Sequence, residues 1–444
     1  MKIIISGAGE VGTHLAKLLS FENQDILVVD ADRDKLVPLD TAYNLMTLCG
    51  SPTSFNTLRE AGVNGCDLYI AVTPYESTNL VSCSIAKSLG AQCTVARISH
   101  YGFMDKANTR AMNNMGVDRL IYPEYLAAME IITALDHSWV RNWFELHDGR
   151  IILVGVRIRD NAPLAGVQLK NLSRMNTHMH VSAIRRNHET IIPRGNDTVM
   201  SGDVLYITTT RDHIDNIIEL CGKVKRKIRK VLIMGGSKIA IRLVNMAGER
   251  FKFTIIDNNR DVCAALPLKC PQASVIHGDA RDPEILYEAG IDDCDAFIAL
   301  SPSSESNILT CLTAKELGIS KSVAEVEDFQ FIRQAEGLGI GTVINKKLLA
   351  TSSIFQLLLD ADSSTSKCLA LTDAEVAELE VRPGAKITRS AVKDLHLDRD
   401  MTLAALIRGN EGMLVSGATQ IQPGDKVLVF CLAGSLHKIE KLFN

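Results

Sequence analysis

The sequence lacks any apolar run of the roughly 18 to 20 residues that a helix needs to cross a bilayer, so a membrane role would have to be peripheral. Residues 1–7 lead directly into an expected strand and a glycine turn, without the longer apolar core and the small-residue cleavage site of a signal peptide. The eleven cysteines form no CxxC pair and no metal-ligand spacing, which is typical of reduced thiols. Together these absences predict a cytoplasmic chain with no metal site.

The charge balance lacks the basic excess that binding to nucleic acids usually requires, because the formal net charge of the 444 residues is −4. Hydrophobic residues make up 46% and charged residues 23%, which is an ordinary globular composition. At roughly 150 residues per domain, the length predicts about three domains, with two to four all compatible. We therefore expect a multidomain globular protein that does not bind nucleic acids.

What the sequence does contain is an internal repeat at an offset of 228 residues. Such self-similarity indicates a duplicated structural unit. The matched segments, each given with its copy, are 5–9 with 233–237, 28–34 with 255–261 (one residue out of step), 58–63 with 286–291, 67–74 with 295–302, and Asn79 with Asn307.

The front part of each unit alternates short apolar runs with helical periodicity, which predicts a parallel sheet wound on both faces by helices. Helical stretches such as 12–21 and 79–89 separate the expected strands of the first unit, which are 2–6, 26–29, 46–49, 68–72, 94–98 and 120–122. This α/β, Rossmann-like domain is expected over 1–135, and its copy over 228–360.

The back part of each unit combines short strands with glycine-containing turns, which predicts a small α+β domain over 140–222 and again over 365–444. Its expected strands are 151–156, 181–185 and 204–207 and, in the second unit, 403–408 and 427–430. The turns 201–203 and 423–425 look like the same turn into the same strand. The basic linker from Lys223 to Lys230 has two interpretations: a solvated connection, or a patch that faces anionic lipid or an acidic partner.

A catalytic constellation is lacking. The eleven histidines are dispersed, and none falls in a recognisable nucleophile or metal motif. His178 and His180, which would share a strand face, are interpreted as a surface pair. A dehydrogenase would need a substrate domain with a proton-transfer group beside the nicotinamide, whereas the back parts are small, duplicated and without a catalytic motif. We therefore predict that the protein is not an enzyme.

A glycine motif, Gly7-Ala8-Gly9-Glu10-Val11-Gly12, follows the first expected strand and opens a helix. Asp30 ends the next strand, which completes the arrangement of a dinucleotide-binding site. Gly7 would permit the tight turn, Gly9 would let the backbone approach a pyrophosphate, and Gly12 would let the helix pack closely on the sheet. The helix N-terminus would hold the phosphates. Asp30 would accept hydrogen bonds from a ribose and repel a 2′-phosphate, which favours NAD(H) over NADP(H).

Three further positions lie at strand ends, on the edge where open α/β sheets bind ligands. They are Gly50-Ser51, Thr73-Pro74 and Arg97. The small side chain of Thr73 leaves room for a ribose and can form a hydrogen bond with it. Arg97 has two interpretations: contact with a phosphate or a neighbouring subunit, or a surface salt bridge.

The second copy of this site is altered, since Ser237 and Ala240 stand at the positions of Gly9 and Gly12, and Glu325 replaces Arg97. A Cβ at the close-approach position would obstruct a pyrophosphate, although the serine hydroxyl could donate to it. Two interpretations stay open: a second nucleotide site, or a vestigial copy kept for assembly. The candidate binding residues of this copy are Gly235, Gly236, Ser237, Lys238, Ile239, Asp257, Gly278, Asp279 and Ser301.

The chain resembles the regulatory subunits of Trk-type potassium-uptake systems. The building block of that family pairs an RCK N-terminal (KTN) domain with a TrkA-C domain. The resemblance covers essentially the whole chain in the order N, C, N, C. The family often has Gly-Asp after the third strand, where the first half has Gly50-Ser51 and the second has Gly278-Asp279. The segments that carry the resemblance are the glycine motif, 29–30, 70–73, Asn79, 116–118 and Pro123-Glu124, the last replaced by Lys346-Lys347 in the second half.

The resemblance implies a peripheral subunit on the cytoplasmic face of a Trk-type potassium-transporting membrane subunit. The resemblance also implies a homo-oligomeric ring of these domains, here expected as a tetramer or a dimer of dimers. Such a ring is expected to bind NAD(H) or ATP and ADP and to gate the membrane partner. Arg33 and Asn79 complete the expected nucleotide-binding residues. The alternatives are a nucleotide-sensing regulator of another potassium channel or antiporter, and an NAD-dependent oxidoreductase.

Overall fold

The computed structural model describes residues 1–20, 24–43, 45–175, 178–187, 189–361, 365–371, 374–432 and 435–443. The chain divides into two compact units. The first contains Met1–Ala127 together with Asn345–Leu357, and the second contains Ala128–Ile344 together with Leu358–Asn444. A short segment from the second half of the sequence is therefore part of the first unit.

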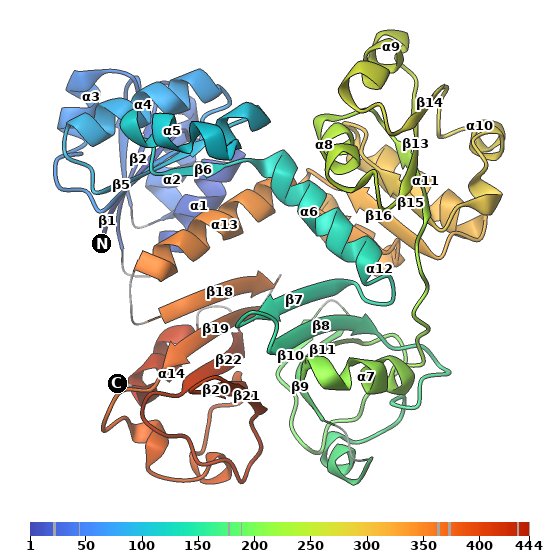
Figure 1. Cartoon of the computed structure of the whole chain (residues 1–444). Helices are drawn as coiled ribbons and strands as arrows, with labels where there is room; N and C mark the ends of the chain where they lie inside the picture. The colour runs from blue at the N-terminus through green and yellow to red at the C-terminus, as the bar shows by residue number, and fades with distance from the viewer. Residues whose placement is uncertain are drawn as a thin grey trace. The chain divides into compact units, whose positions relative to one another are not determined.

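A six-stranded parallel sheet forms the centre of the first unit (Figure 1). Its strand order, β3-β2-β1-β4-β5-β6, is that of doubly wound nucleotide-binding folds, and it reverses between β1 and β4. Ile3, Ile4 and Ile5 of the central strand are fully buried, as expected of a sheet covered on both faces. The predicted fold class is thus confirmed, with β1 (Lys2–Ser6), β2 (Asp25–Asp30), β3 (Met46–Cys49), β4 (Leu68–Ala71), β5 (Cys93–Arg97) and β6 (Arg119–Ile121).

Helices cover both faces of this sheet. Figure 1 shows α1 and α13 along one face and α4 and α5 along the other. The apolar positions of α1 recur at helical spacing, with Val11, Leu15 and Leu19 buried. The expected helix over 12–21 ends at a residue outside the described ranges. The helices are α1 (Glu10–Ser20), α2 (Arg33–Ala42), α3 (Phe55–Glu60), α4 (Glu76–Ser88), α5 (Thr109–Asn114), α6 (Pro123–Asp136) and α13 (Lys346–Ala361).

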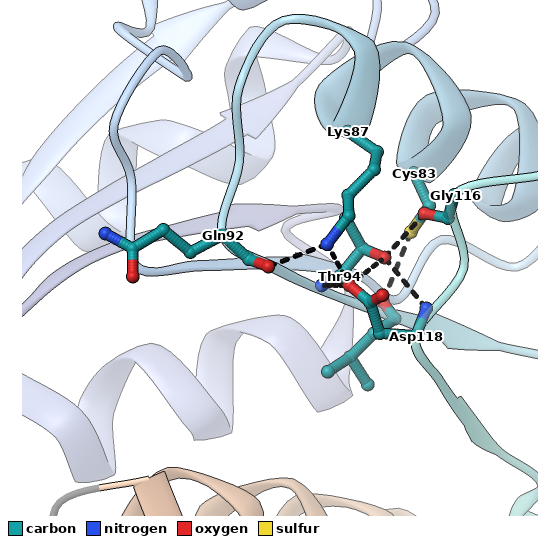
Figure 2. A network of polar contacts seen from close by, with 7 residues as sticks. Cys83, Lys87, Gln92, Thr94, Gly116 and Asp118 are labelled. Carbon is teal, nitrogen blue, oxygen red and sulfur yellow. Dashed lines mark hydrogen bonds and ion pairs between the residues drawn. The ribbon is translucent and has the colours of Figure 1, made fainter. Parts of the chain in front are cut away.

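A polar network fixes the last strands of this sheet (Figure 2). The Asp118 carboxylate accepts hydrogen bonds from the Thr94 N–H and from Lys87 Nζ of α4, both at 2.8 Å. The Thr94 hydroxyl donates to the Gly116 carbonyl at 2.7 Å. Segment 116–118, one of those that carry the family resemblance, therefore joins β5, β6 and α4.

The second unit contains a second six-stranded parallel sheet, with the equivalent order β14-β13-β12-β15-β16-β17. Its strands are β12 (Lys230–Met234), β13 (Lys252–Asp257), β14 (Ser274–His277), β15 (Ala296–Ala299), β16 (Lys321–Glu325) and β17 (Thr342–Ile344). Its helices are α8 (Lys238–Ala247), α9 (Arg260–Lys269), α10 (Pro283–Glu288), α11 (Ser304–Glu316) and α12 (Phe329–Leu338).

The helices that follow the two parallel sheets are exchanged. Asn345–Leu357, most of α13, belongs to the first unit, where Lys347 forms an ion pair with Glu10 of α1. The part of α6 from Ala128 onward belongs to the second unit, where Asp136 pairs with Arg250. Boundaries at 135 and 360 would keep each helix with its own sheet, so the compact units differ from the domains expected from the sequence.

Two five-stranded antiparallel sheets complete the second unit. Their orders, β10-β9-β11-β8-β7 and β21-β20-β22-β19-β18, are equivalent. The first has β7 (Asn142–Leu146), β8 (Ile151–Arg157), β9 (Met179–Arg186), β10 (Glu189–Ile191) and β11 (Val204–Thr210), followed by α7 (Ile214–Leu220). The second has β18 (Thr365–Leu371), β19 (Ala374–Glu380), β20 (Met401–Arg408), β21 (Glu411–Leu414) and β22 (Lys426–Leu432), followed by α14 (Leu436–Phe443).

The two small sheets share one apolar core, to which Leu153 and Tyr206 contribute from one sheet and Phe430 from the other. His180 lies between them, where its Nε2 is 3.2 Å from the Thr402 hydroxyl and burial lowers its pKa to about 4. The prediction of a surface histidine pair is therefore wrong for His180. His178 instead stacks on the ring of His213, with 3.9 Å between ring centroids.

Candidate nucleotide-binding sites

The three glycines of the first loop have different surroundings. Gly7 has a φ of +107°, and an added Cβ would lie 2.9 Å from the Thr73 nitrogen. At Gly12 an added Cβ would lie 1.8 Å from the Gly7 carbonyl oxygen, so the turn and the helix meet without room for a side chain. At Gly9 no atom lies within 4 Å of such a Cβ. Gly9 therefore faces open space at the N-terminus of α1, where a ligand's phosphates would approach.

The carboxylate of Asp30 organises this loop. Its Oδ2 accepts a hydrogen bond from the Ala8 N–H at 2.7 Å, and its Oδ1 accepts one from the Asp32 N–H at 2.9 Å. In the second copy Asp257 accepts in the same way from the N–H groups of Gly236 and Asn259, at 2.7 and 2.8 Å. Each acid thus ties its glycine turn to the end of the neighbouring strand, and each oxygen retains a lone pair for a ribose hydroxyl.

Asn79 lies beneath the first site. Its side chain is fully buried, and its Oδ1 accepts from both the N–H and the hydroxyl of Thr73, at 2.9 and 2.7 Å. Its Nδ2 donates to the carbonyls of Thr73 and Arg97. Asn307 makes the same four contacts with Ser301 and Glu325. Asn79 was expected to bind nucleotide, but its amide is fully occupied, and it acts by positioning Thr73 at the strand end.

The two copies differ after the third strand. Gly50 donates its N–H to the Asp30 carbonyl at 2.9 Å, and the Ser51 hydroxyl lies 3.0 Å from that of Thr53. In the second copy Asp279 forms an ion pair with Arg281 at 2.6 Å, and the side-chain hydrogen bond from Arg281 lowers the pKa of the Asp279 carboxyl. The second site therefore carries an arginine that the sequence reasoning missed.

A pocket of about 430 Å³ opens at the second site. Seven of the expected residues line it: Gly235, Gly236, Ser237, Asp257, Gly278, Asp279 and Ser301. Arg281, Ser303 and Ser306 line it as well. The last two were missed, although Ser303 is recognisable as the N-cap of α11, where its hydroxyl accepts the Ser306 N–H. A pocket of this volume is in the range of small-molecule and cofactor sites.

Several other expected residues lie at or near the first turn of a helix. Ser237 caps α8, with its hydroxyl accepting the Ala240 N–H at 3.3 Å, so one donor of that helix end is already used. Lys238 opens α8 on the exposed side, whereas Ile239 is buried and does not reach the pocket. Arg33 opens α2, exposed and three residues beyond Asp30.

In the first copy, Glu10 at the start of α1 pairs with Lys347 of the exchanged helix α13. Val11 of the same turn is buried against the sheet. Pro74 is exposed at the end of β4, and Arg97 is partly buried at the end of β5, next to the first site.

Within the described residues, no three histidine, cysteine, aspartate or glutamate side chains are placed to hold a metal ion together. A separate search of the same residues finds no helix both long and apolar enough to cross a membrane. Each site offers a helix N-terminus, which favours phosphates, and a carboxylate, which can accept hydrogen bonds from ribose hydroxyls.

Comparisons with known proteins identify two domain families in the chain. The TrkA-N domain model matches residues 3–123 and 231–346, and the TrkA-C domain model matches residues 153–222 and 376–444. The Trk system potassium uptake protein TrkA of Halomonas elongata is 29% identical over 454 residues, covering 100% of this chain and 99% of the relative. That of Haemophilus influenzae is 28% identical over 452 residues, with coverage of 100% and 99%. The solved structure of the GsuK channel bound to NAD is similar with a TM-score of 0.60 at 16% identity, covering 100% of this chain and 78% of that one.

Proposed function

Because the chain belongs to the family built from TrkA-N and TrkA-C domains, we propose that it is the nucleotide-sensing regulatory subunit of a Trk-type potassium-uptake system. It is a cytoplasmic homo-oligomer that binds to the inner face of the membrane through its potassium-transporting partner, and it is not an enzyme. The full-length similarity to TrkA proteins of two bacteria supports this proposal.

The observation that carries the proposal is the duplicated arrangement of strand, glycine turn and helix N-terminus, with Asp30 or Asp257 holding the turn. This arrangement suits a nucleotide with adjacent ribose and phosphate groups. NAD(H) is the proposed ligand, with ATP and ADP as alternatives, and the similarity to a channel whose structure contains NAD supports the choice.

Regulation requires that the ligand binds two shapes of the protein with different affinity. The ion pair between Glu10 and Lys347 places α13 at the N-terminus of α1, where the phosphates would bind. A phosphate at that position attracts Lys347 and competes with Glu10 for it. Because α13 continues into residues of the second unit, nucleotide binding at the first site can change the arrangement of the domains through this contact.

The test is calorimetric titration of NAD+, NADH, ATP and ADP into the intact chain, followed by potassium flux through the reconstituted membrane partner. We expect at least one nucleotide to bind and to change the flux. No binding by any of the four nucleotides would contradict the proposal. A second candidate, a regulator of a separate potassium channel, is favoured by the similarity to GsuK. The protein that co-purifies from membranes distinguishes the two.

A further inference from the structure

In the first half of the chain a carboxylate neutralises a lysine, and the second half keeps the equivalent lysine but has no equivalent carboxylate. In the first half Lys87 pairs with Asp118 at 2.8 Å (Figure 2). The repeat offset places Lys315 at the position of Lys87. Strand pairing places Gly341 at the position of Asp118, because each precedes the residue that pairs with the equivalent Val95 or Val323. The lysine is retained, and the aspartate is replaced by glycine.

Arginines gather where the carboxylate is missing. Lys315 Nζ donates to the Gly339 carbonyl at 2.8 Å. A Cβ added to Gly339 would lie 2.7 Å from Arg157 Nη1 and 3.7 Å from Arg141 Nη2, so both guanidinium groups lie beside the same turn. These arginines come from the first small sheet and the loop before it, whereas Lys315 and Gly339 belong to the second parallel-sheet domain.

Two more cations, Lys223 and Arg159, belong to the same cluster. The pKa of Lys223 is lowered to about 8, first by burial and then by Arg159, Arg141 and Arg157, while Cys221 acts in the opposite direction. The pKa of Lys315 is lowered as well, first by burial and then by Arg157, Arg159 and Arg141. The cations are therefore close enough to repel one another. With Arg185, the junction cluster comprises Arg141, Arg157, Arg159, Arg185, Lys223 and Lys315.

The negative groups at this junction do not balance the cluster. Glu336 forms an ion pair with Arg185, and its backbone carbonyl accepts from Arg141 Nη1 at 3.3 Å. The C-termini of α11 and α12 each contribute about half a negative charge. Lys321 and Glu130 also lie near Arg141, but burial lowers the pKa of Lys321 to about 7 and raises that of Glu130, so both groups favour their neutral forms. Among the described residues, about four positive charges therefore remain uncompensated.

We propose that the junction cluster binds a small, multiply charged phosphate anion between the first TrkA-C domain and the second parallel-sheet domain. Guanidinium groups suit this ligand because their planar forks bind phosphate oxygens in pairs. The cavity beside Arg141 and Arg185 has a volume of only about 30 Å³. The anion therefore lies on the exposed side, against Arg157, Arg159 and Lys315, and joins the two domains. This site is distinct from both nucleotide loops.

The experiment measures binding of inorganic pyrophosphate to the intact chain by calorimetry at low ionic strength. We expect one saturable site per chain that weakens as salt is added. The double variant Arg157→Gln/Arg159→Gln should raise the Kd on the order of tenfold or more, since it removes two charge-assisted contacts. Lys315→Gln should act in the same direction. These side chains are exposed, and thermal melts will confirm that the variants are folded.

The second TrkA-C domain provides the matched control. The Ile158 carbonyl accepts the N–H of Gly202, and the Val381 carbonyl accepts that of the equivalent Gly424, so Arg157 and Arg159 correspond to Glu380 and Arg382. Arg382→Gln should leave pyrophosphate binding unchanged, and NADH affinity should be unchanged in every variant. ATP is titrated in parallel. If ATP binding is lost in the double variant, the ligand is the phosphate chain of a nucleotide, and if ATP does not bind at this site, the ligand is free phosphate. Absence of pyrophosphate binding, or equal affinity in the double variant, overturns the proposal without affecting the proposed function.

Discussion

At the scale of single residues, the same side chain often serves the fold and the site together. Asp30 accepts two backbone hydrogen bonds that hold the glycine turn, and it stands where a ribose would bind. Asn79 is buried and positions Thr73. The acid is thus placed to contact ligand directly, whereas the amide acts through its neighbour.

Asp30→Ala is predicted to weaken nucleotide binding while the fold survives, because a hydrogen bond to a charged group contributes about 1.5–3 kcal/mol. Asp30→Asn keeps one acceptor oxygen for the Ala8 N–H and should lose less affinity. Calorimetry with each adenine nucleotide measures both changes, and circular dichroism checks the fold. Unchanged affinity of Asp30→Ala for all of them would refute the role given to Asp30.

Lys321 gives a prediction for how the free energy of unfolding depends on pH. Its pKa is lowered to about 7, first by burial, with Arg141 acting in the same direction and Glu130 in the opposite one. An unfolded lysine holds its proton up to about pH 10.5. Between these values the unfolded state binds more protons than the folded state, so this lysine makes stability rise with pH, by up to about 1.4 kcal/mol per pH unit.

Lys321→Met should therefore flatten the rise of the free energy of unfolding between pH 7 and pH 9, measured by urea titration. Lys252→Met replaces an exposed lysine of the same unit and should leave the slope unchanged. Equal slopes in the wild type and in Lys321→Met would show that Lys321 is protonated in the folded protein.

At the scale of elements, the two glycine loops differ in what already occupies the helix end. Gly9 leaves the N-terminus of α1 open, whereas the Ser237 hydroxyl caps α8. A dinucleotide is therefore predicted to prefer the first site. The pocket at the second site suits a ligand that relies on Asp279 and Arg281.

Gly9→Val should abolish NADH binding at the first site, because a branched side chain enters the space through which a pyrophosphate would pass. The fold should tolerate it, since no atom lies within 4 Å of an added Cβ. Ser237→Val should affect NADH binding less but cost about 0.5–2 kcal/mol of stability through the lost cap. NADH titration and thermal melts of both variants separate the two effects. Loss of NADH binding in Ser237→Val alone would reverse the ranking of the sites.

At the scale of the whole molecule, the duplication pairs the two TrkA-C sheets within one chain. Their shared core, with Tyr206 and Phe430, buries faces that a single copy would leave exposed. The exchanged helices α6 and α13 add a second connection between the halves of the sequence. Association between chains is therefore expected to use other surfaces.

The protein is predicted to be a homo-oligomer, a tetramer or a dimer of dimers, because duplicated domains supply repeated surfaces suited to closed symmetry. Multi-angle light scattering at micromolar concentration measures the mass directly, against a chain of 48.5 kDa. A mass equal to that of one chain, with and without NADH, would exclude this assembly.

Much of the fold could be predicted because its signals are local. The strands Lys2–Ser6 and Met46–Cys49 match their predicted bounds, since each is a short apolar run closed by a turn. Strands at sheet edges, such as Glu189–Ile191 and Glu411–Leu414, were not predicted because they are short and begin with an exposed glutamate. Ala374–Glu380 was missed because its alanines and glutamates are more typical of a helix.

The sequence by itself determined the duplicated plan and the strand, turn and helix around Asp30 and Asp257, because these depend on residues close together in the chain. Only the tertiary structure decided that α6 and α13 are exchanged, because two similar sheets offer each helix a similar apolar face. It also decided that His180 lies between the two small sheets, next to Thr402, and that cations converge beside Gly339. Such contacts join residues from different elements, and their energies depend on burial and on charge at short range, which no local pattern records.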